Sequence, residues 1–101
     1  MRLAFLGTST FACPSLTALS ERHDICLVVT QPDRPVGRHA VLAPPAVKQQ
    51  ALRLGLPVFQ PERVSRDVAV ERLREASPEA IVVASYGQLL RANVFELPPL
   101  G

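Results

Sequence analysis

The sequence is poor in the residues that build metal sites and disulfide frameworks. It has two cysteines, Cys13 and Cys26, with no CxxC spacing and no histidine nearby at a ligand spacing. Isolated thiols of this kind are expected to be buried small hydrophobes rather than ligands or a disulfide. His23 and His39 have no acidic or cysteine partner in a motif, so we expect both on the surface and no bound metal.

Long hydrophobic runs are also absent. No apolar run approaches the roughly 20 residues that a membrane-spanning helix needs. The opening MRLAFLG is too short for a secretory signal and lacks its cleavage pattern. With 101 residues, of which 48% are hydrophobic, the chain is expected to form one domain and to remain in the cytoplasm.

The common nucleotide-binding signatures are missing. GTSTFA, which follows the first predicted strand, supplies no second or third glycine of GxGxxG, although Asp33 falls near the usual place of a ribose-binding acid. The absence of GxxxxGK[ST] excludes a P-loop. A basic helix with interleaved aromatics, typical of a general DNA or RNA module, is missing as well.

Short apolar, β-branched runs alternate with helical patterns along the chain. Strands are predicted at residues 2–6, 25–30, 58–60 and 80–85, and helices at residues 14–22, 47–54 and 66–76. Pro14 suits a first helical turn, and Ser65 is the predicted N-cap of the last helix. This alternation predicts the α/β class, with a Rossmann-like doubly wound parallel sheet.

The fourth predicted strand has the composition of an inner strand. AIVVAS at residues 80–85 carries no charge or proline of the kind that protects a sheet edge. We therefore expect a fifth strand after Gly101, so that residues 1–101 form a single incomplete domain, truncated after the fourth strand. Such a fragment is expected to self-associate. The alternative is a self-contained protein that completes its sheet by pairing with a partner.

Residues 30–48, TQPDRPVGRHAVLAPPAVK, are too many for an ordinary connection, since strand-to-helix loops usually take about two to six residues. Four prolines make helix or inner strand improbable over residues 32–45. The charged residues of this segment sum to +2, the net charge of the whole chain: Asp33, Arg34, Arg38 and Lys48. We interpret it as a functional cationic loop that recognises phosphate oxygens, with a plain solvated excursion as the alternative.

Ligands of open α/β sheets gather outside the carboxyl ends of the strands, near the point where the strand order reverses. Three segments are expected to converge there: residues 7–11, 30–48 and 85–90. After the last strand, the YGQ run exposes main-chain groups between apolar neighbours, and a flat heterocycle could be held there by paired hydrogen bonds. A plain strand-to-helix turn is the equally open alternative.

The motifs also carry a family resemblance. The runs MRLAFLGTSTFACPSL, VVTQPDRPVGRHAVLAPPAVK, GLPVFQPE, IVVASYGQLL and LPPLG resemble the N-terminal part of the methionyl-tRNA formyltransferases, over the full length of this chain. The resemblance implies a monomeric enzyme of translation initiation. It would transfer a formyl group from 10-formyltetrahydrofolate to the amino group of methionine on initiator tRNA.

The same resemblance assigns roles to residues of this sequence. Arg34, Arg38 and Lys48 would contact the tRNA, and Phe11 would help to wall the methionyl pocket. Main-chain groups would hold the pterin ring of the folate, with the binding segment formed by Tyr86, Gly87, Gln88, Leu89 and Leu90.

Two departures from the family pattern matter. The family loop commonly reads GRGKKL, whereas residues 37–42 read GRHAVL and lack both lysines. The family's Asn-x-His pair and later Asp would lie after Gly101, and amine attack on a formyl group needs an oxyanion donor and a proton acceptor. No catalytic residue is therefore assigned within this chain, and the isolated chain is expected to be inactive. A non-catalytic Rossmann-like module that binds a nucleotide or an anion is the alternative function.

Overall fold

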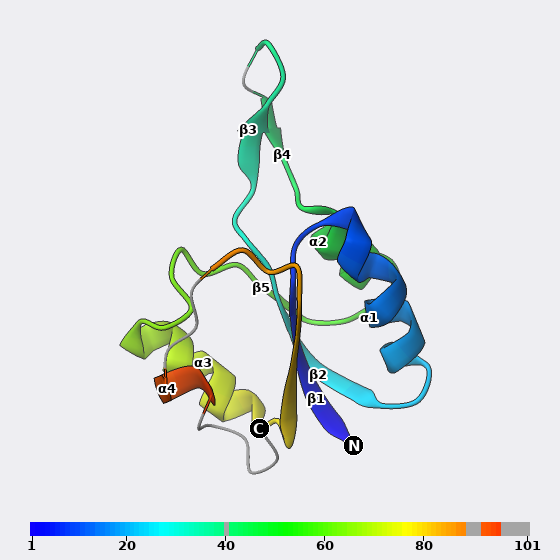
Figure 1. Ribbon diagram of the computed structural model, residues 1–101, viewed down its shortest axis with the longest axis vertical. Helices are drawn as coiled ribbons and strands as arrows, with labels where there is room; N and C mark the ends of the chain where they lie inside the picture. Colours follow the sequence, from blue (N-terminus) through cyan, green and yellow to red (C-terminus); the bar gives the residue numbers. More distant parts are fainter. Residues whose placement is uncertain (40, 89–91, 96–101) are drawn as a thin grey trace.

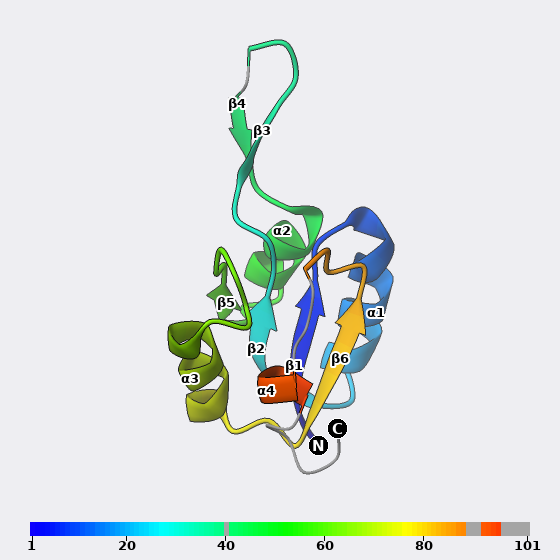
Figure 2. The same cartoon turned by 60° about the vertical axis from the view of Figure 1, so that its left-hand side comes forward.

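A computed structural model describes residues 1–39, 41–88 and 92–95 of the chain. Four strands form one parallel sheet in the order β5-β2-β1-β6, and their bounds are β1 (Arg2–Gly7), β2 (Asp24–Val29), β5 (Val58–Phe59) and β6 (Ala80–Ala84) (Figure 1 and Figure 2). β1 is central, with Phe5 opposite Val28 of β2 on one side and Val82 of β6 on the other. The predicted α/β class with a parallel sheet is confirmed.

Helices cover both faces of this sheet (Figure 2). On one face, α1 (Cys13–Ser20) and α2 (Ala46–Arg53) pack against alternate strand residues, and the buried core there includes Leu3, Phe5, Leu16, Ile25, Val28, Val47 and Ala51. On the other face lie α3 (Asp67–Ala76) and the short α4 (Ala92–Phe95), over a core that includes Ala4, Leu6, Leu27, Val29, Val70, Leu73 and Val94. Strands with apolar residues in both directions are expected when a parallel sheet is covered on both faces.

The helix ends follow the predicted signals with small corrections. Pro14 lies in the first turn of α1, as predicted, and the 3-10 helix η1 (Thr10–Ala12) leads into it. Gly55, at φ 72°, closes the end of α2. The prediction of Ser65 as an N-cap is wrong: α3 begins at Asp67, and Arg66 occupies the N-cap without a side-chain cap hydrogen bond. Arg66 is extended (φ −74°, ψ 151°), so the first helical residue is Asp67, whose carboxylate lies at the positive end of the helix dipole.

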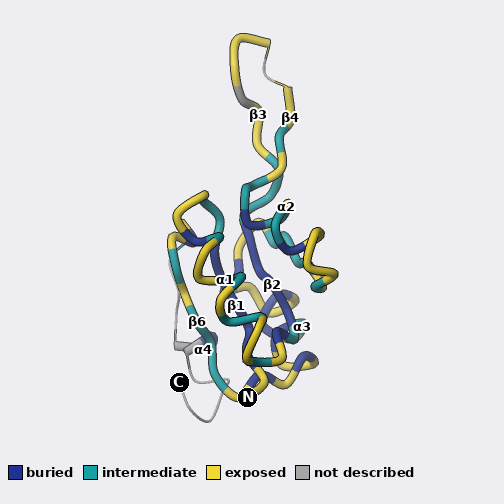
Figure 3. The backbone as a smooth tube through the Cα atoms, turned by 90° about the vertical axis from the view of Figure 1, so that its right-hand side faces the viewer, coloured by how far each residue is buried: buried dark blue, intermediate teal, exposed yellow. Residues whose placement is uncertain are grey.

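The long connection after β2 is a β-hairpin rather than a loop. β3 (Arg34–Val36) and β4 (Val41–Ala43) pair antiparallel, with Pro35 opposite Leu42. This ribbon projects from the carboxyl end of the sheet, and most of its described residues are exposed (Figure 3). The prolines do keep the segment out of the main sheet, but a two-stranded ribbon tolerates Pro35, since each of its strands has one side free of ladder bonds.

β6 lies at the margin of the sheet among the described strands. It pairs with β1 on one side, and its Val83 is 48% exposed. β6, whose apolar composition predicted an inner strand, therefore has no second neighbouring strand within the part of the chain that the structure describes.

Candidate functional site

The strand order reverses at β1, because β2 and β5 follow it on one side and β6 returns to the other. Thr8 comes directly after β1 and binds the segment that follows β6. Its N–H donates to the carbonyl oxygen of Ser85 at 3.0 Å, and its hydroxyl donates to the carbonyl oxygen of Tyr86 at 2.6 Å. Two of the three segments expected to converge are thus joined at the ligand edge of an open α/β sheet.

The third segment joins them through residues at the base of the hairpin. The N–H of Gln31 lies 3.4 Å from the Thr8 hydroxyl oxygen, and the N–H of Val47, in the first turn of α2, donates to the Thr8 carbonyl oxygen at 3.2 Å. The Gln31 side chain meets that of Gln88 at 3.0 Å. The predicted convergence of all three segments is confirmed by these contacts.

A charged cluster supports the hairpin base. The Lys48 ammonium binds the Asp33 carboxylate at 3.1 Å, and the Gln60 side-chain amide donates to the same carboxylate at 2.7 Å. The Gln60 hydrogen bond and the Lys48 contact hold the pKa of Asp33 below its ordinary value. The Lys48 side chain is 23% exposed, so its charge is directed toward Asp33 within the domain.

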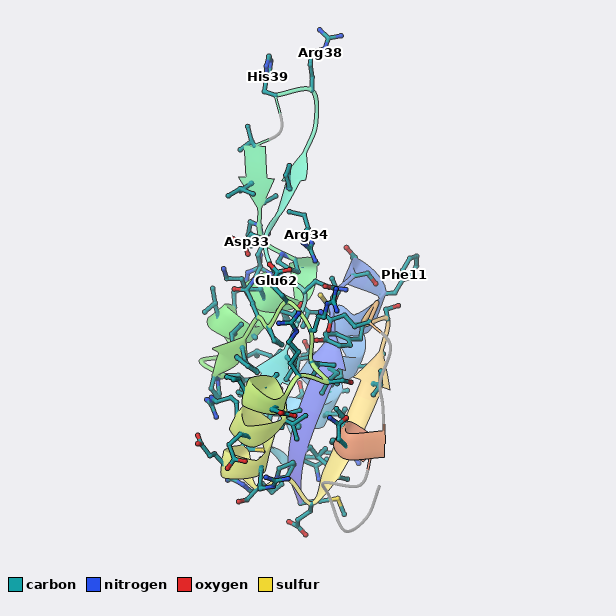
Figure 4. All side chains as sticks on the ribbon, turned by 90° about the vertical axis from the view of Figure 1, so that its left-hand side faces the viewer. Phe11, Asp33, Arg34, Arg38, His39 and Glu62 are labelled. Carbon is teal, nitrogen blue, oxygen red and sulfur yellow. The ribbon has the colours of Figure 1, made fainter. Side chains whose placement is uncertain are left out.

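Arg34, Arg38 and Phe11 are exposed at the carboxyl end of the sheet or on the hairpin that extends from it (Figure 4). Figure 4 shows Arg38 and His39 at the far end of the hairpin, and Arg34, Asp33 and Glu62 near its base. An Arg34 guanidinium nitrogen lies 3.9 Å from the Glu62 carboxylate, and both side chains are largely exposed. Phe11 is 89% exposed on η1. Arg38 is therefore well placed to meet a ligand from solution.

The segment after β6 combines a buried aromatic residue with a turned main chain. Tyr86 is 3% exposed and packs in the core beneath α3 and α4, and this burial raises the pKa of Tyr86 well above its usual range. Ser85 and Gly87 both have positive φ, 51° and 95°. The Gln88 amide binds residues 61–64. Leu89 and Leu90, the other two residues predicted to hold the ring, lie outside the described residues.

Sequence reasoning missed part of this site. Gln31, Gln60 and Glu62 all lie at its base, yet none was singled out. Gln31 and Gln60 each come one or two residues after the end of a parallel strand, β2 and β5. A search of the polar residues at the end of, or directly after, every predicted strand would have found both.

The two cysteines, Cys13 and Cys26, are half-buried free thiols. Desolvation raises the pKa of Cys26, which disfavours its reactive thiolate. His39 is exposed as predicted, whereas His23 is half-buried. Within the described ranges, no group of three or more histidine, cysteine or acidic residues is placed to hold a metal ion. The helices in those ranges are also too short to span a bilayer.

Comparison with known proteins gives the family. The family model described as Formyl transferase matches residues 1–101, the whole chain. The methionyl-tRNA formyltransferase of Macrococcus caseolyticus is 49% identical over 100 residues, which are 99% of this chain and 32% of that protein. The methionyl-tRNA formyltransferase of Herpetosiphon aurantiacus is 52% identical over 102 residues, with 100% of this chain and 33% of that protein covered. The chain thus spans about a third of the length of these curated relatives.

A solved structure agrees with the fold. Phosphoribosylglycinamide formyltransferase from Bacillus halodurans superposes with a TM-score of 0.64 at 15% identity, over 93% of this chain and 50% of that one. At this identity the likeness concerns the fold alone. The match of the family model over every residue decides the assignment: this chain belongs to the formyl transferase family.

Proposed function

We propose that this chain forms the N-terminal portion of the catalytic domain of an enzyme that transfers a formyl group from 10-formyltetrahydrofolate to methionine on initiator tRNA. The observation that carries the proposal is that the cationic hairpin and the turn after β6 are joined where the strand order reverses. Hydrogen bonds of Thr8, Gln31 and Gln88 join them. The names of relatives that are 45–52% identical to this chain supply the formyl transfer and the methionyl-tRNA substrate.

The chain's share of the folate site would be the main chain after β6. The carbonyls of Ser85 and Tyr86 are already bound by Thr8, and the Tyr86 ring is buried. Tyr86 would therefore support the site, while the groups that meet the pterin ring would come from Gly87 to Leu90. A turned backbone with positive φ at Gly87 fits this role, because it directs amide and carbonyl groups away from the ladder of β6.

The chain's share of the tRNA site would be the hairpin. Arg38, exposed at its far end, would be the principal phosphate contact, with Arg34 as a second forked cation nearer the domain. Lys48 would act mainly by neutralising Asp33 and fixing the hairpin base. Phe11, exposed beside the end of β1, would contact the methionyl side chain. With so few cations, tRNA binding by this chain would depend steeply on salt.

The groups that move protons would lie elsewhere in the enzyme. Among residues 1–39, 41–88 and 92–95, the carboxylates in ion pairs are bound by lysine or arginine, and His39 is at the hairpin end. Collapse of the tetrahedral oxyanion needs a donor and a base held together. This chain would accordingly bind and orient both substrates without performing the proton transfers.

Ligand titration tests the binding part of the proposal. The ¹⁵N-labelled chain is titrated with 5-formyltetrahydrofolate, a stable folate, and in parallel with NAD and ATP. The folate should shift the amide signals of residues 85–88, and the two nucleotides should leave residues 7–11 unchanged. Shifts at residues 7–11 with NAD or ATP, together with silence toward the folate, would replace this function by a nucleotide-binding module.

A chimera tests the reaction itself. Residues 1–101 are fused to the remaining two thirds of the Macrococcus caseolyticus enzyme, which aligns with this chain over 100 residues. The chimera should formylate methionyl-tRNA from 10-formyltetrahydrofolate. A chimera that melts cooperatively yet forms no formylmethionyl-tRNA would contradict the proposal.

A further inference from the structure

Gln31 is the residue at which the segments following all four strands of the sheet meet. It comes two positions after the end of β2 and contacts residues that follow β1, β5 and β6. We infer that Gln31 is a positioning residue: it ties the hairpin to the turn after β6, and so fixes the two proposed substrate sites relative to each other. The catalytic meaning of this link rests on the proposed function, whereas the link itself is a property of the fold.

Its main-chain groups hold two of the strand ends. The Gln31 N–H points to the Thr8 hydroxyl oxygen at 3.4 Å, and its carbonyl oxygen accepts from the Gln60 side-chain amide at 3.1 Å. The same Gln60 nitrogen donates to Asp33 at 2.7 Å. One amide group thus bridges the segment after β5 to both Gln31 and the hairpin base.

The side chain of Gln31 binds the hairpin and the turn after β6. The Gln31 Oε1 accepts from Gln88 Nε2 at 3.0 Å and from the Arg34 guanidinium at 3.2 Å. Arg34 begins β3, and Gln88 belongs to the turn after β6. A single oxygen atom therefore connects the hairpin that carries Arg38 to the turn proposed to hold the pterin ring.

Hydrogen-bonding chemistry fixes the orientation of these amides. The Val64 N–H can only donate, so the Gln88 atom 2.8 Å from it must be the oxygen. The Gln88 nitrogen then faces three acceptors, which are Gln31 Oε1 and the carbonyl oxygens of Pro61 and Glu62. Arg34 also can only donate, which independently assigns the oxygen of Gln31 to the position between Arg34 and Gln88.

The backbone around this link is shaped to admit it. A Cβ on Gly87 would come within 3.0 Å of Gln31 Nε2, so the Gln31 side chain lies directly against the Gly87 main chain. Gly87 also has φ 95°, a conformation that favours glycine. The turn after β6 thus presents a side-chain-free surface at the point where Gln31 crosses it.

The substitution Gln31→Met tests the inference. Methionine keeps the length of the side chain and both main-chain contacts but removes the acceptor shared by Arg34 and Gln88. Gln31→Glu restores an acceptor, and Gln49→Met makes the same replacement at an exposed glutamine of α2 outside the network. Gln31 is half-buried and outside the core clusters, so all three variants should fold.

Two readouts on the chain, kept at a concentration below that at which it associates, separate this inference from the proposed function. Backbone ¹⁵N relaxation without ligand should show increased motion at both residues 34–39 and residues 87–88 in Gln31→Met, with wild-type values in Gln31→Glu and Gln49→Met. On adding 5-formyltetrahydrofolate, hairpin signals should respond in the wild type and lose that response in Gln31→Met. Unchanged relaxation in Gln31→Met would overturn the inference. Changed relaxation in a chain that ignores the folate would support the link and count against the proposed function.

Discussion

Asp33 links the stability of this domain to pH. Its carboxylate accepts hydrogen bonds from Gln60 and Lys48, which lower its pKa in the folded chain below the ordinary 3.8. A lowered folded-state pKa means that the ionised form stabilises the fold above pH 3.8, and that this contribution is lost as the pH falls through the folded-state value.

The variant Asp33→Asn should therefore be less stable than the wild type at neutral pH, with the difference narrowing below about pH 4. Urea unfolding at a series of pH values measures this. Gln60→Ala removes the hydrogen bond that lowers the Asp33 pKa most, so it should reduce the pH-dependent part of the stability difference between Asp33→Asn and the wild type. Gln49→Ala on α2 should leave that difference intact. A constant gap between Asp33→Asn and the wild type across the acid range would contradict the assignment.

The reason for a glycine at position 7 cannot be read from the sequence alone. The first strand was predicted to end at residue 6, so Gly7 was expected to follow it, but Gly7 is the last residue of β1. A Cβ there would lie 2.8 Å from the Ala84 carbonyl oxygen and 2.7 Å from the Phe5 ring, so glycine is required by the close approach of β1 and β6. The sequence places a glycine, but only the sheet order reveals which neighbour makes it necessary.

The hairpin is the element that the sequence describes incompletely. Prolines and charges correctly predicted an exposed segment outside the main sheet, because those residues act locally. The pairing of residues 34–36 with residues 41–43 depends on the turn between them and on which edge of the strand around Pro35 is left without a partner strand. The sequence of the segment does not specify this register. Helices α1, α2 and α3 and the strands of the main sheet were predictable because short apolar runs and helical spacings specify them locally.

The hairpin also yields a prediction about nucleic acid. Arg38 is exposed at its far end, away from the two core clusters, so Arg38→Ala should leave the urea midpoint unchanged. Affinity for initiator tRNA should fall, and the slope of log affinity against log salt should decrease by about one unit, as expected for the loss of one phosphate contact. Fluorescence anisotropy at several salt concentrations measures both quantities.

Arg53→Ala is the matched control, since Arg53 is an exposed arginine that ends α2 and binds Gln50 within the helix. It should change neither the affinity nor the salt slope. If both arginine variants weaken binding equally, the charge of the whole chain rather than the hairpin attracts the tRNA.

At the scale of the whole molecule, sheet order decides where function can reside. The order β5-β2-β1-β6 brings Thr8 against Ser85 and Tyr86, residues far apart in the sequence, and leaves β6 at the margin of the described sheet. The strand pattern alone predicted a parallel sheet, yet several strand orders share that pattern. The order is set by which strands pair, and those pairings join residues that lie far apart in the sequence.

The margin of the sheet yields the last prediction. Val83 of β6 is 48% exposed on a strand that has no charge or proline to discourage pairing with another chain. We expect the 101-residue chain to associate as its concentration rises, and we expect Val83→Lys to shift that association to at least several-fold higher concentration. Val68→Lys makes the same change at an 83% exposed valine on α3, away from the strand edge, and should leave association unchanged. Sedimentation velocity over a concentration series distinguishes them: equal effects of both lysines would indicate that general surface charge, rather than the edge of β6, controls self-association.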